Sequence, residues 1–211
     1  MNIGGFLRHH AAGIIFLAIL LGGIGLVLYP AFQHETSNAR RSICQSNLHD
    51  IMRACLEYQT DYGGRYPPLS DGGTKGWSVI LQRSAPNVHL GFSCPEGYES
   101  SFAPTSDYFY NARCAGRKED SVVDPASTIA FGDGLDNGPT NSHYWQLPND
   151  GANPHSVLRR HYWGSNYAFA DGHVKMLIPE QVSEWGQDEK GNGSTRFKFS
   201  PDGHASHRER R

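Results

Sequence analysis

The chain opens with a hydrophobic run that has no polar face. From Ala11 to Tyr29 no residue is charged, and apolar side chains would fall on every side of a helix. As a helix this run would be about 28 Å long, close to the hydrocarbon core of a bilayer at about 30 Å. The pattern predicts a transmembrane helix over residues 11–29, preceded by an N-terminal segment over residues 1–10. Arg8 in that segment favours a cytoplasmic N-terminus.

A cleaved signal peptide is the main alternative for this run. Signal peptides have an apolar core of about 7–15 residues followed by a small-residue cleavage site. The run here is longer, and it ends in Tyr29-Pro30-Ala31-Phe32 without such a site. A buried core helix is disfavoured because the run is apolar on all faces and lies at the N-terminus. The pattern therefore favours a retained anchor.

After Pro30 the apolar residues narrow to a single stripe. They recur at steps of three and four, at Cys44, Leu48, Ile51, Cys55, Tyr58 and Tyr62. This spacing marks one face of an α-helix. Gly63-Gly64 and Pro67-Pro68 are typical of a helix end. We expect the helix to continue as an amphipathic segment over residues 30–62, kinked or interrupted by Pro30.

From residue 63 the signals change to turns and short β-prone runs. Asn166–Ala170 and His173–Ile178 are separated by Asp171-Gly172, which predicts a two-residue hairpin. Residues 157–162 are the expected third strand of an antiparallel meander, and Ser127–Phe131 is another β-prone run. The run Trp77–Gln82 fits a short helix or a strand, and the pattern does not decide between them.

These elements predict an α+β fold in which an antiparallel sheet packs on the long helix. Tyr167 and Phe169 share one face of their strand, and a sheet with one apolar face needs a cover. The amphipathic segment is the natural cover. We expect a β-rich domain over residues 63–185 and a polar tail over residues 186–211, with an edge strand at 196–199 and a mobile end.

The charge balance narrows the class of partner. The 211 residues have a formal net charge of -2, which argues against nucleic acid because phosphate binding needs a basic surface. The sequence contains no nucleophile motif, no phosphate-binding glycine loop and no His-Glu-x-x-His motif. It therefore predicts a protein that is not an enzyme and needs no cofactor.

The four cysteines limit which disulfides can form. No Cys-x-x-Cys pair occurs, so their spacings fit no zinc module. Cys44 and Cys55 would lie about 16 Å apart along the predicted helix and cannot bond to each other. Cys94 and Cys114 are the plausible intrachain pair, and whether they bond stays open.

Several segments, taken in order, resemble one family. They are the helix exit Tyr62-Gly-Gly-Arg-Tyr-Pro-Pro68, then Phe92-Ser-Cys-Pro95, then Asp107–Asn111, and finally His161 followed by nine residues and Asp171-Gly172. The set resembles type IV pilin-like proteins carrying the prepilin-type, processing-associated His-x9-Asp-Gly domain, whose function is unknown. The resemblance covers about residues 30–178. It implies a pilin-like fold and association with other pilin-like subunits in a filament, an envelope assembly or a type II secretion system.

The N-terminus departs from the family pattern. Counting back from Pro30 places Gly13 where pilins carry a glutamate in the helix. In pilins that glutamate pairs with a neighbour's N-terminal amine during assembly. Processing of the N-terminus and formation of filaments therefore stay open.

His161 and Asp171 of this signature are the first candidates for chemistry, since histidine and carboxylate can bind zinc or share a proton. The predicted meander, however, places Asp171 in a turn at the far end of its strand from His161. We therefore expect a turn at Asp171-Gly172 and a structural His161 that hydrogen-bonds to a loop.

A second candidate site is the acidic loop with Asp133, Asp136 and Asn137, whose oxygens suit calcium. Their spacing matches no complete calcium loop and the closing glutamate is missing, so an ordinary turn cluster is favoured.

Taken together, the patterns predict a membrane-anchored, pilin-like structural subunit of the cytoplasmic membrane, with its C-terminal domain outside the cytoplasm. The expected partners are the membrane and like subunits. The alternative is a membrane-tethered binding module for a metal ion or small ligand, built on the region rich in histidine and aspartate.

Overall fold

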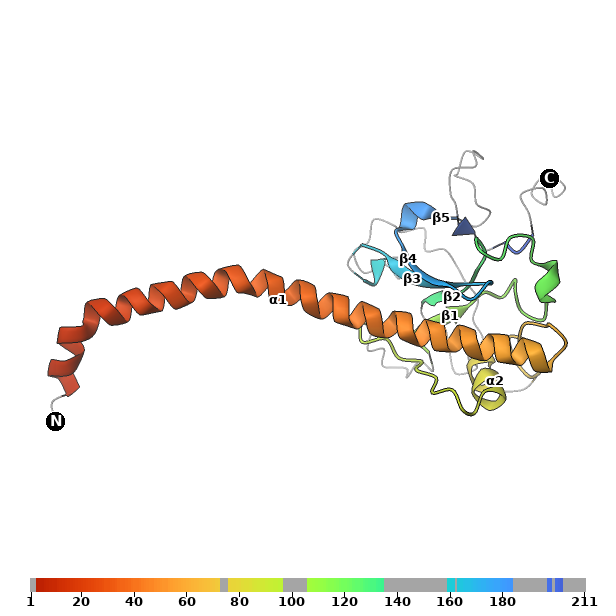
Figure 1. Cartoon of the computed structure of the whole chain (residues 1–211), viewed down its shortest axis with the longest axis horizontal. Helices are drawn as coiled ribbons and strands as arrows, with labels where there is room; N and C mark the ends of the chain where they lie inside the picture. The colour runs from red at the N-terminus through yellow and green to blue at the C-terminus, as the bar shows by residue number, and fades with distance from the viewer. Residues whose placement is uncertain are drawn as a thin grey trace. The chain divides into compact units, whose positions relative to one another are not determined.

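The computed structural model describes residues 3–72, 76–96, 106–134, 159–161, 163–183, 197–198 and 200–202. In the first part of the long helix it describes the side chains of residues 11, 13–29, 35 and 37–39. The chain divides into two compact units, residues 1–39 and 40–211, and each unit is described by itself. Figure 1 labels the helices and strands.

Helix α1 spans Ile3–Asp61 and passes through Pro30 without a break. The predicted continuation of the helix is confirmed, whereas the interruption offered for Pro30 does not occur, and the helix begins before the apolar run. In the unit of residues 1–39 the large apolar side chains from Ile14 to Tyr29 are exposed, and Leu26 reaches 80%. Among the described residues, no helix combines the length and the apolar character needed to cross a membrane. The transmembrane part of the predicted fold stays a prediction.

In the unit of residues 40–211, the predicted stripe is the buried face of α1. Cys44, Leu48, Ile51 and Cys55 are completely buried. The stripe ends one turn earlier than predicted, because Tyr62 is 54% exposed and stacks on Tyr58 from outside, with ring centroids 4.0 Å apart. The helix face that follows the 3.6-residue period thus lies in the core of this unit.

Two glycines end α1, as the sequence predicts. Gly63 and Gly64 have φ angles of 65° and 73°, which a residue with a Cβ adopts only at a cost. The N–H of Gly64 donates to the carbonyl of Gln59 at 2.7 Å. This hydrogen bond closes a Schellman-type cap and turns the chain back along the helix.

Four strands form one antiparallel sheet in the order β1-β2-β3-β4. They are β1 (Tyr108–Tyr110), β2 (Ile129–Asp133), β3 (Ser165–Phe169) and β4 (Val174–Leu177). The last three confirm the predicted β-runs with shifted bounds. The predicted strand at 157–162 is wrong for its described residues, because β2 and β4 already pair with the two edges of β3. His161 instead bridges to Gly164 in a tight turn.

The hairpin between β3 and β4 has three loop residues rather than the predicted two. Phe169 pairs with His173 through a 2.9 Å hydrogen bond, and the N–H of Gly172 donates to the carbonyl of Phe169 at 2.9 Å. Gly172 has a φ angle of 101°. This is the hairpin in which a turn is followed by a glycine bulge. Asp171 is therefore a turn residue, and Gly172 alone supplies the left-handed conformation.

Both faces of the sheet are apolar and buried. Tyr108, Tyr110 and Ala168 belong to the core cluster that contains the α1 stripe. Phe109, Tyr167 and Phe169 belong to a second cluster on the opposite face, as strand alternation requires. The prediction that α1 covers Tyr167 and Phe169 is therefore wrong, because the helix covers the other face.

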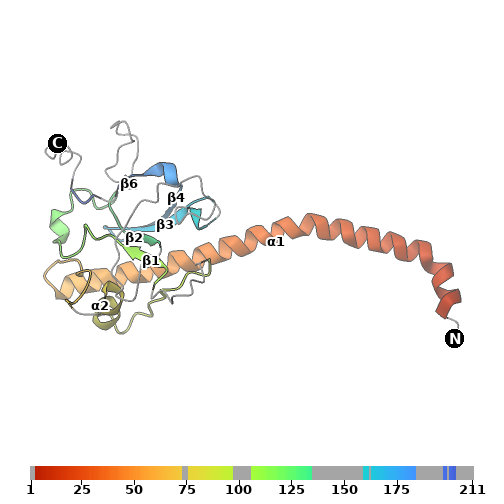
Figure 2. The same ribbon diagram turned by 180° about the vertical axis from the view of Figure 1, so that it is seen from behind.

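A short two-stranded layer covers the second face. Strand β5 (Val182–Ser183) pairs in parallel with β6 (Phe197–Lys198). Val182 and Phe197 join the second cluster. Figure 2 shows this layer on the side of the sheet away from α1. The predicted edge strand at 196–199 is confirmed at 197–198, but it pairs with β5. Asp202 is also held, 2.8 Å from Arg117, so these described residues of the predicted tail belong to the fold.

Helix α2 (Trp77–Ser84) decides the ambiguous run in favour of a helix. Its buried Trp77 contacts Phe131 of β2, with ring centroids 5.4 Å apart, and meets Phe92 edge-on at 5.8 Å. Helix α2 therefore packs on the same face of the sheet as α1. Two short 3-10 helices, Glu119–Ser121 and Pro179–Gln181, connect the strands.

Replacing Ile51 with alanine tests the core assignment of α1. Ile51 is completely buried, whereas Ile43 on the same helix is 49% exposed. We expect Ile51→Ala to lower the free energy of unfolding by about 2–5 kcal/mol, because it leaves a cavity, and Ile43→Ala to change it by less than about 0.5 kcal/mol. Urea unfolding of the full chain in mild detergent measures both values. Equal losses in the two variants would contradict the assignment.

Candidate functional site

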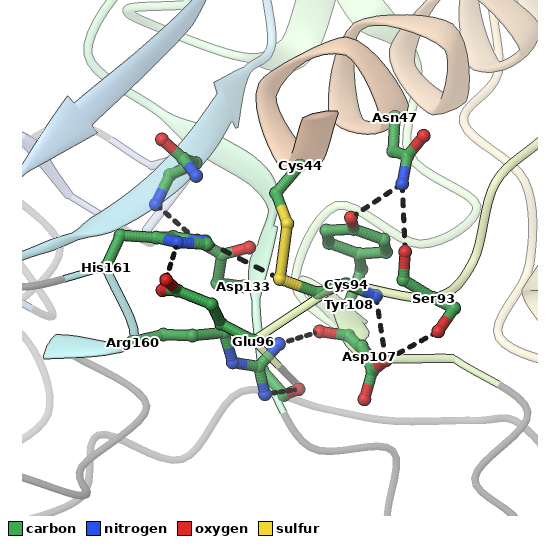
Figure 3. Close-up of a disulfide and its surroundings, with 12 residues drawn as sticks. Cys44, Asn47, Ser93, Cys94, Glu96, Asp107, Tyr108, Asp133, Arg160 and His161 are labelled. Carbon is green, nitrogen blue, oxygen red and sulfur yellow. Dashed lines mark hydrogen bonds and ion pairs between the residues drawn. A yellow bond between two sulfur atoms is a disulfide. The ribbon is translucent and has the colours of Figure 1, made fainter. Parts of the chain in front are cut away.

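A buried polar cluster lies where β1 begins, β2 ends and a loop crosses α1 (Figure 3). It consists of His161, Glu96, Asp133 and the disulfide between Cys44 and Cys94, and we refer to it as the His161 centre. Its members come from α1, the loop 91–96, the end of β2 and the turn before β3. They are far apart in the sequence, so the fold alone brings them together.

The disulfide differs from the one that the sequence made plausible. Cys94 bonds to Cys44, with the two Cα atoms 5.5 Å apart, and not to Cys114. Cys44 lies on the buried face of α1, and the loop after α2 returns along that face. Cys114 is free and buried elsewhere in the core. The bond closes a chain segment with a sequence separation of 50 and ties the loop to the helix.

Asn47 holds the same loop one helical turn after Cys44. Its amide Nδ2 donates to the carbonyl of Ser93 and to the hydroxyl of Tyr108, both at 3.0 Å. Gly91 is needed for this approach, because a Cβ at that position would lie 2.5 Å from the Asn47 side chain. Helix α1 therefore holds the loop by a covalent bond and a hydrogen bond, and it holds β1 by a second hydrogen bond.

Asp107 closes the loop from the sheet side. Its carboxylate accepts hydrogen bonds from the backbone N–H of Cys94 at 2.8 Å and from the Ser93 hydroxyl at 3.3 Å. The Arg160 guanidinium donates to the backbone carbonyls of Asp107 and Gly134. These contacts hold the end of β2 and the start of β1 against the segment that carries His161.

The imidazole of His161 lies between two carboxylates. Nδ1 is 2.8 Å from Glu96 Oε2, and Nε2 is 3.2 Å from Asp133 Oδ2. The same Nε2 is 3.6 Å from the Sγ of Cys94. The His161 side chain is only 1% exposed. Each contact is attractive only when a proton lies between the ring nitrogen and the carboxylate oxygen that faces it.

Asp133 contributes an acceptor that the described residues leave unpaired. Its Oδ2 accepts from the backbone N–H of Asn166 at 2.6 Å, while its buried Oδ1 has no hydrogen-bond partner among them. The side-chain amide of Asn166 is buried and likewise has no partner there for Nδ2 or Oδ1. Unpaired buried polar atoms are costly and call for an explanation.

The geometry separates the two residues of the sequence signature. His161 is in the buried centre, as a residue hydrogen-bonded to a loop, whereas Asp171 lies in the exposed hairpin with its carboxylate 2.6 Å from His173 Nδ1. Asp133 of the acidic loop joins the His161 centre. Asp136 and Asn137 lie outside the described residues, so the calcium hypothesis stays a prediction.

Sequence reasoning missed Glu96 as a partner of His161, and it missed Arg160 and Asn47, which hold the surrounding segments. These three residues carry no pattern that separates them from ordinary surface residues. One signal was available, since Cys94-Pro95 lies beside Glu96 and Cys44 lies on the apolar stripe. Pairing them requires knowing that the loop after α2 runs back along α1.

The two free thiols are core groups rather than reactive ones. Burial, with the nearby Cys114, raises the pKa of Cys55 well above its usual value, and burial raises the pKa of Cys114 to about 12. A thiol that keeps its proton is a poor nucleophile. Neither cysteine therefore offers a nucleophile in the folded state.

No protein-family model matches the chain, and no curated protein or solved structure matches it.

Thiol labelling tests the cysteine assignment. When the oxidised chain is unfolded and alkylated without a reductant, we expect label on Cys55 and Cys114 and a disulfide-linked peptide pair containing Cys44 and Cys94. Before unfolding, neither free thiol should react, because both are buried. Peptide mass spectrometry measures both results. Label on Cys44, together with a linked peptide pair containing Cys94 and Cys114, would contradict this assignment.

The raised pKa of Cys55 predicts a stability that falls at alkaline pH. Above the ordinary thiol pKa of 9.0 the unfolded chain releases a proton that the folded chain retains. The unfolded state then binds fewer protons, so stability decreases as pH rises. Cys55→Ala should make this decrease shallower by up to about 1.4 kcal/mol per pH unit. Met52→Ala removes a buried side chain that does not titrate, so it should lower stability and leave the slope unchanged. Urea unfolding at several alkaline pH values measures both slopes, and identical slopes in wild type and Cys55→Ala would refute the prediction.

Proposed function

We propose that this chain is a non-catalytic, pilin-like structural subunit, anchored in the cytoplasmic membrane by the apolar half of α1. The β-rich domain would lie outside the cytoplasm and take part in an envelope, secretion or filament-type assembly. One observation carries the proposal. A single unbroken helix presents exposed apolar side chains over one part and supplies the core stripe of a folded domain over another.

The exposed apolar part of α1 needs a non-aqueous partner. From Ile14 to Tyr29, twelve large apolar side chains would otherwise face water, and several are more than half exposed: Ile15, Phe16, Leu17, Ile19, Leu21, Leu26, Val27 and Tyr29. Monomeric soluble proteins rarely expose contiguous patches of this kind. With Ala11 and Ala12, the uncharged run is about 28 Å long as a helix, which a bilayer accommodates with slight local thinning. A membrane is therefore the partner that the run fits.

Small residues on α1 support association with like subunits. Gly22, Gly23 and Gly25 have no atom within 4 Å of the position that a Cβ would occupy. Their backbone is therefore open to close approach by another helix, the contact that small residues permit between helices in membranes. The expected neighbour is the same segment of a second pilin-like subunit.

The disulfide supports the placement of the domain outside the cytoplasm. Disulfides persist in oxidising compartments and are rare in the cytosol. The bond between Cys44 and Cys94 joins α1 to the domain's loop, so the helix cannot slide out of the domain under load. A subunit whose helix transmits force to its domain needs such a connection.

Vesicle flotation tests the anchor. The purified full chain is mixed with phosphatidylcholine and phosphatidylglycerol vesicles after detergent removal, and wild type is expected to float with them. Replacing both Leu20 and Ile24 with lysine should abolish flotation, because each charge costs about 2.5–3.5 kcal/mol at the centre of a bilayer. Val123→Lys, which changes an exposed apolar residue of the domain (68%), should float like wild type. If the wild-type chain stays at the bottom of the gradient as a monomer, the anchor is refuted. If it stays there as a large oligomer, binding to the bilayer is refuted but association between subunits is supported.

A further inference from the structure

We propose that the His161 centre is a zinc site controlled by thiol oxidation. When the disulfide is reduced, Cys44, Cys94, His161 and Asp133 would bind one Zn²⁺, and oxidation would release it. The inference goes beyond the structural role and does not depend on it, because all four residues belong to the folded domain.

The four ligand atoms are already assembled. One donor atom each from Cys44, Cys94, Asp133 and His161 lies within 4.8 Å of the other three, and all four residues are buried. A tetrahedral zinc site with bonds of about 2.0–2.3 Å needs ligand atoms about 3.3–3.8 Å apart. The contacts of His161 Nε2 with Asp133 Oδ2 at 3.2 Å and with Cys94 Sγ at 3.6 Å are close to that spacing. Once reduced, the two sulfurs need only move apart to match it.

Glu96 orients the histidine as zinc sites require. It lies 2.8 Å from Nδ1, the ring nitrogen that faces away from the cluster. Ligand histidines commonly donate this second N–H to a carboxylate, which fixes the ring and leaves the other nitrogen's lone pair directed at the metal. In the oxidised form a proton between Nε2 and Asp133 satisfies the same geometry. The metal would take the place of that proton.

Asp133 Oδ1 provides the independent observation. It is buried and has no hydrogen-bond partner among the described residues, although the side chain of Asp133 is completely buried. A carboxylate acceptor left unpaired in the core is costly, and a cation would compensate it. The neighbouring buried amide of Asn166 also has no partner in the part of the chain that the structure describes. The cluster therefore has acceptor capacity that the described contacts do not use.

The donor set selects zinc among common ions. Two thiolates, one imidazole and one carboxylate suit Zn²⁺, whereas calcium and magnesium take oxygen ligands. The sequence shows no recognisable motif for this site, because the two cysteines come from a helix and a distant loop rather than from a Cys-x-x-Cys turn. With four protein ligands and full burial it would be a closed, structural site.

The switching reaction balances with a dithiol as reductant. Two electrons and two protons pass from the dithiol to the Cys44–Cys94 bond, giving two thiols and an oxidised, cyclic disulfide. Binding of Zn²⁺ then releases the two thiol protons and the proton on Nε2 to solvent. Oxidation of the two thiolates by a disulfide of the surroundings reverses the process and frees the metal.

The test compares zinc binding by the reduced and oxidised full chain. The chain in mild detergent is reduced with a phosphine, incubated with zinc chloride and desalted, and metal content is measured by mass spectrometry. We expect about one zinc per reduced chain and none per oxidised chain. Substituting Co²⁺ should give the thiolate charge-transfer and tetrahedral absorption bands. Glu96→Gln should weaken zinc binding by about 10–100-fold.

Matched variants locate the ion. His161→Gln and Asp133→Asn should lose zinc through desalting, whereas a double change of Cys55 and Cys114 to alanine should retain it, because those thiols lie outside the cluster. Zinc retained by His161→Gln, or lost from the Cys55/Cys114 variant, would overturn the assignment. If reduction unfolds the chain, zinc must restore its native circular dichroism. Failure to do so, or a folded reduced chain that binds no zinc, would also overturn it.

Discussion

The fold depends on dehydrating one face of α1 between Cys44 and Tyr58. Six side chains from Cys44 to Cys55 are completely buried, and burying this much apolar surface favours the elements that pack over it. The face is too long for the sheet alone to cover, so α2 and the loop 85–96 complete the cover. That demand explains why the loop runs back along the helix, and why Cys94, Asn47 and Ser93 meet there. The polar centre is thus a consequence of how the apolar face is closed.

The sheet imposes a second constraint, because its side chains alternate between two buried faces and each face needs a cover. Tyr167 and Phe169 face away from α1 and need a cover of their own. The chain supplies it from β5 and β6, which lie on either side of a long connection in the sequence. A register shift between Ile129 and Phe131 puts Phe131 on the α1 face although Ile129 lies on the other, and Asp133, two residues after Phe131, shares the face of Phe131. The position of the carboxylate in the His161 centre therefore follows from the packing of the sheet.

The sequence predicted elements that depend on neighbouring residues, and it missed contacts between segments that are far apart in the chain. The stripe from Cys44 to Tyr58, the glycine helix end and the hairpin around Gly172 each follow from residues within a few positions of one another. The prediction of a third strand at 157–162 was wrong for its described residues, 159–161, because strand pairing is set by partners far away in the chain, here β2. The Cys44–Cys94 bond and the contacts of His161 with Glu96 and Asp133 depend on loops whose path no short pattern records. The signature histidine was recognised, and Asp171 is the turn residue that the hairpin pattern predicts, since the signature joins a core position to a hairpin rather than two members of one site.

The polar groups of the His161 centre cost more free energy to bury than a simple link between the loop and α1 would require. A disulfide alone would tie the loop to α1, and apolar residues in place of His161 and Asp133 would avoid burying polar groups that need partners. The Arg160 guanidinium donates to the backbone carbonyls of Asp107 and Gly134 rather than to the carboxylates of the centre. Burying this many polar groups costs more free energy than a site that holds only a proton requires. The arrangement is suited to a site that exchanges the proton for a divalent cation when two neighbouring sulfurs become ligands.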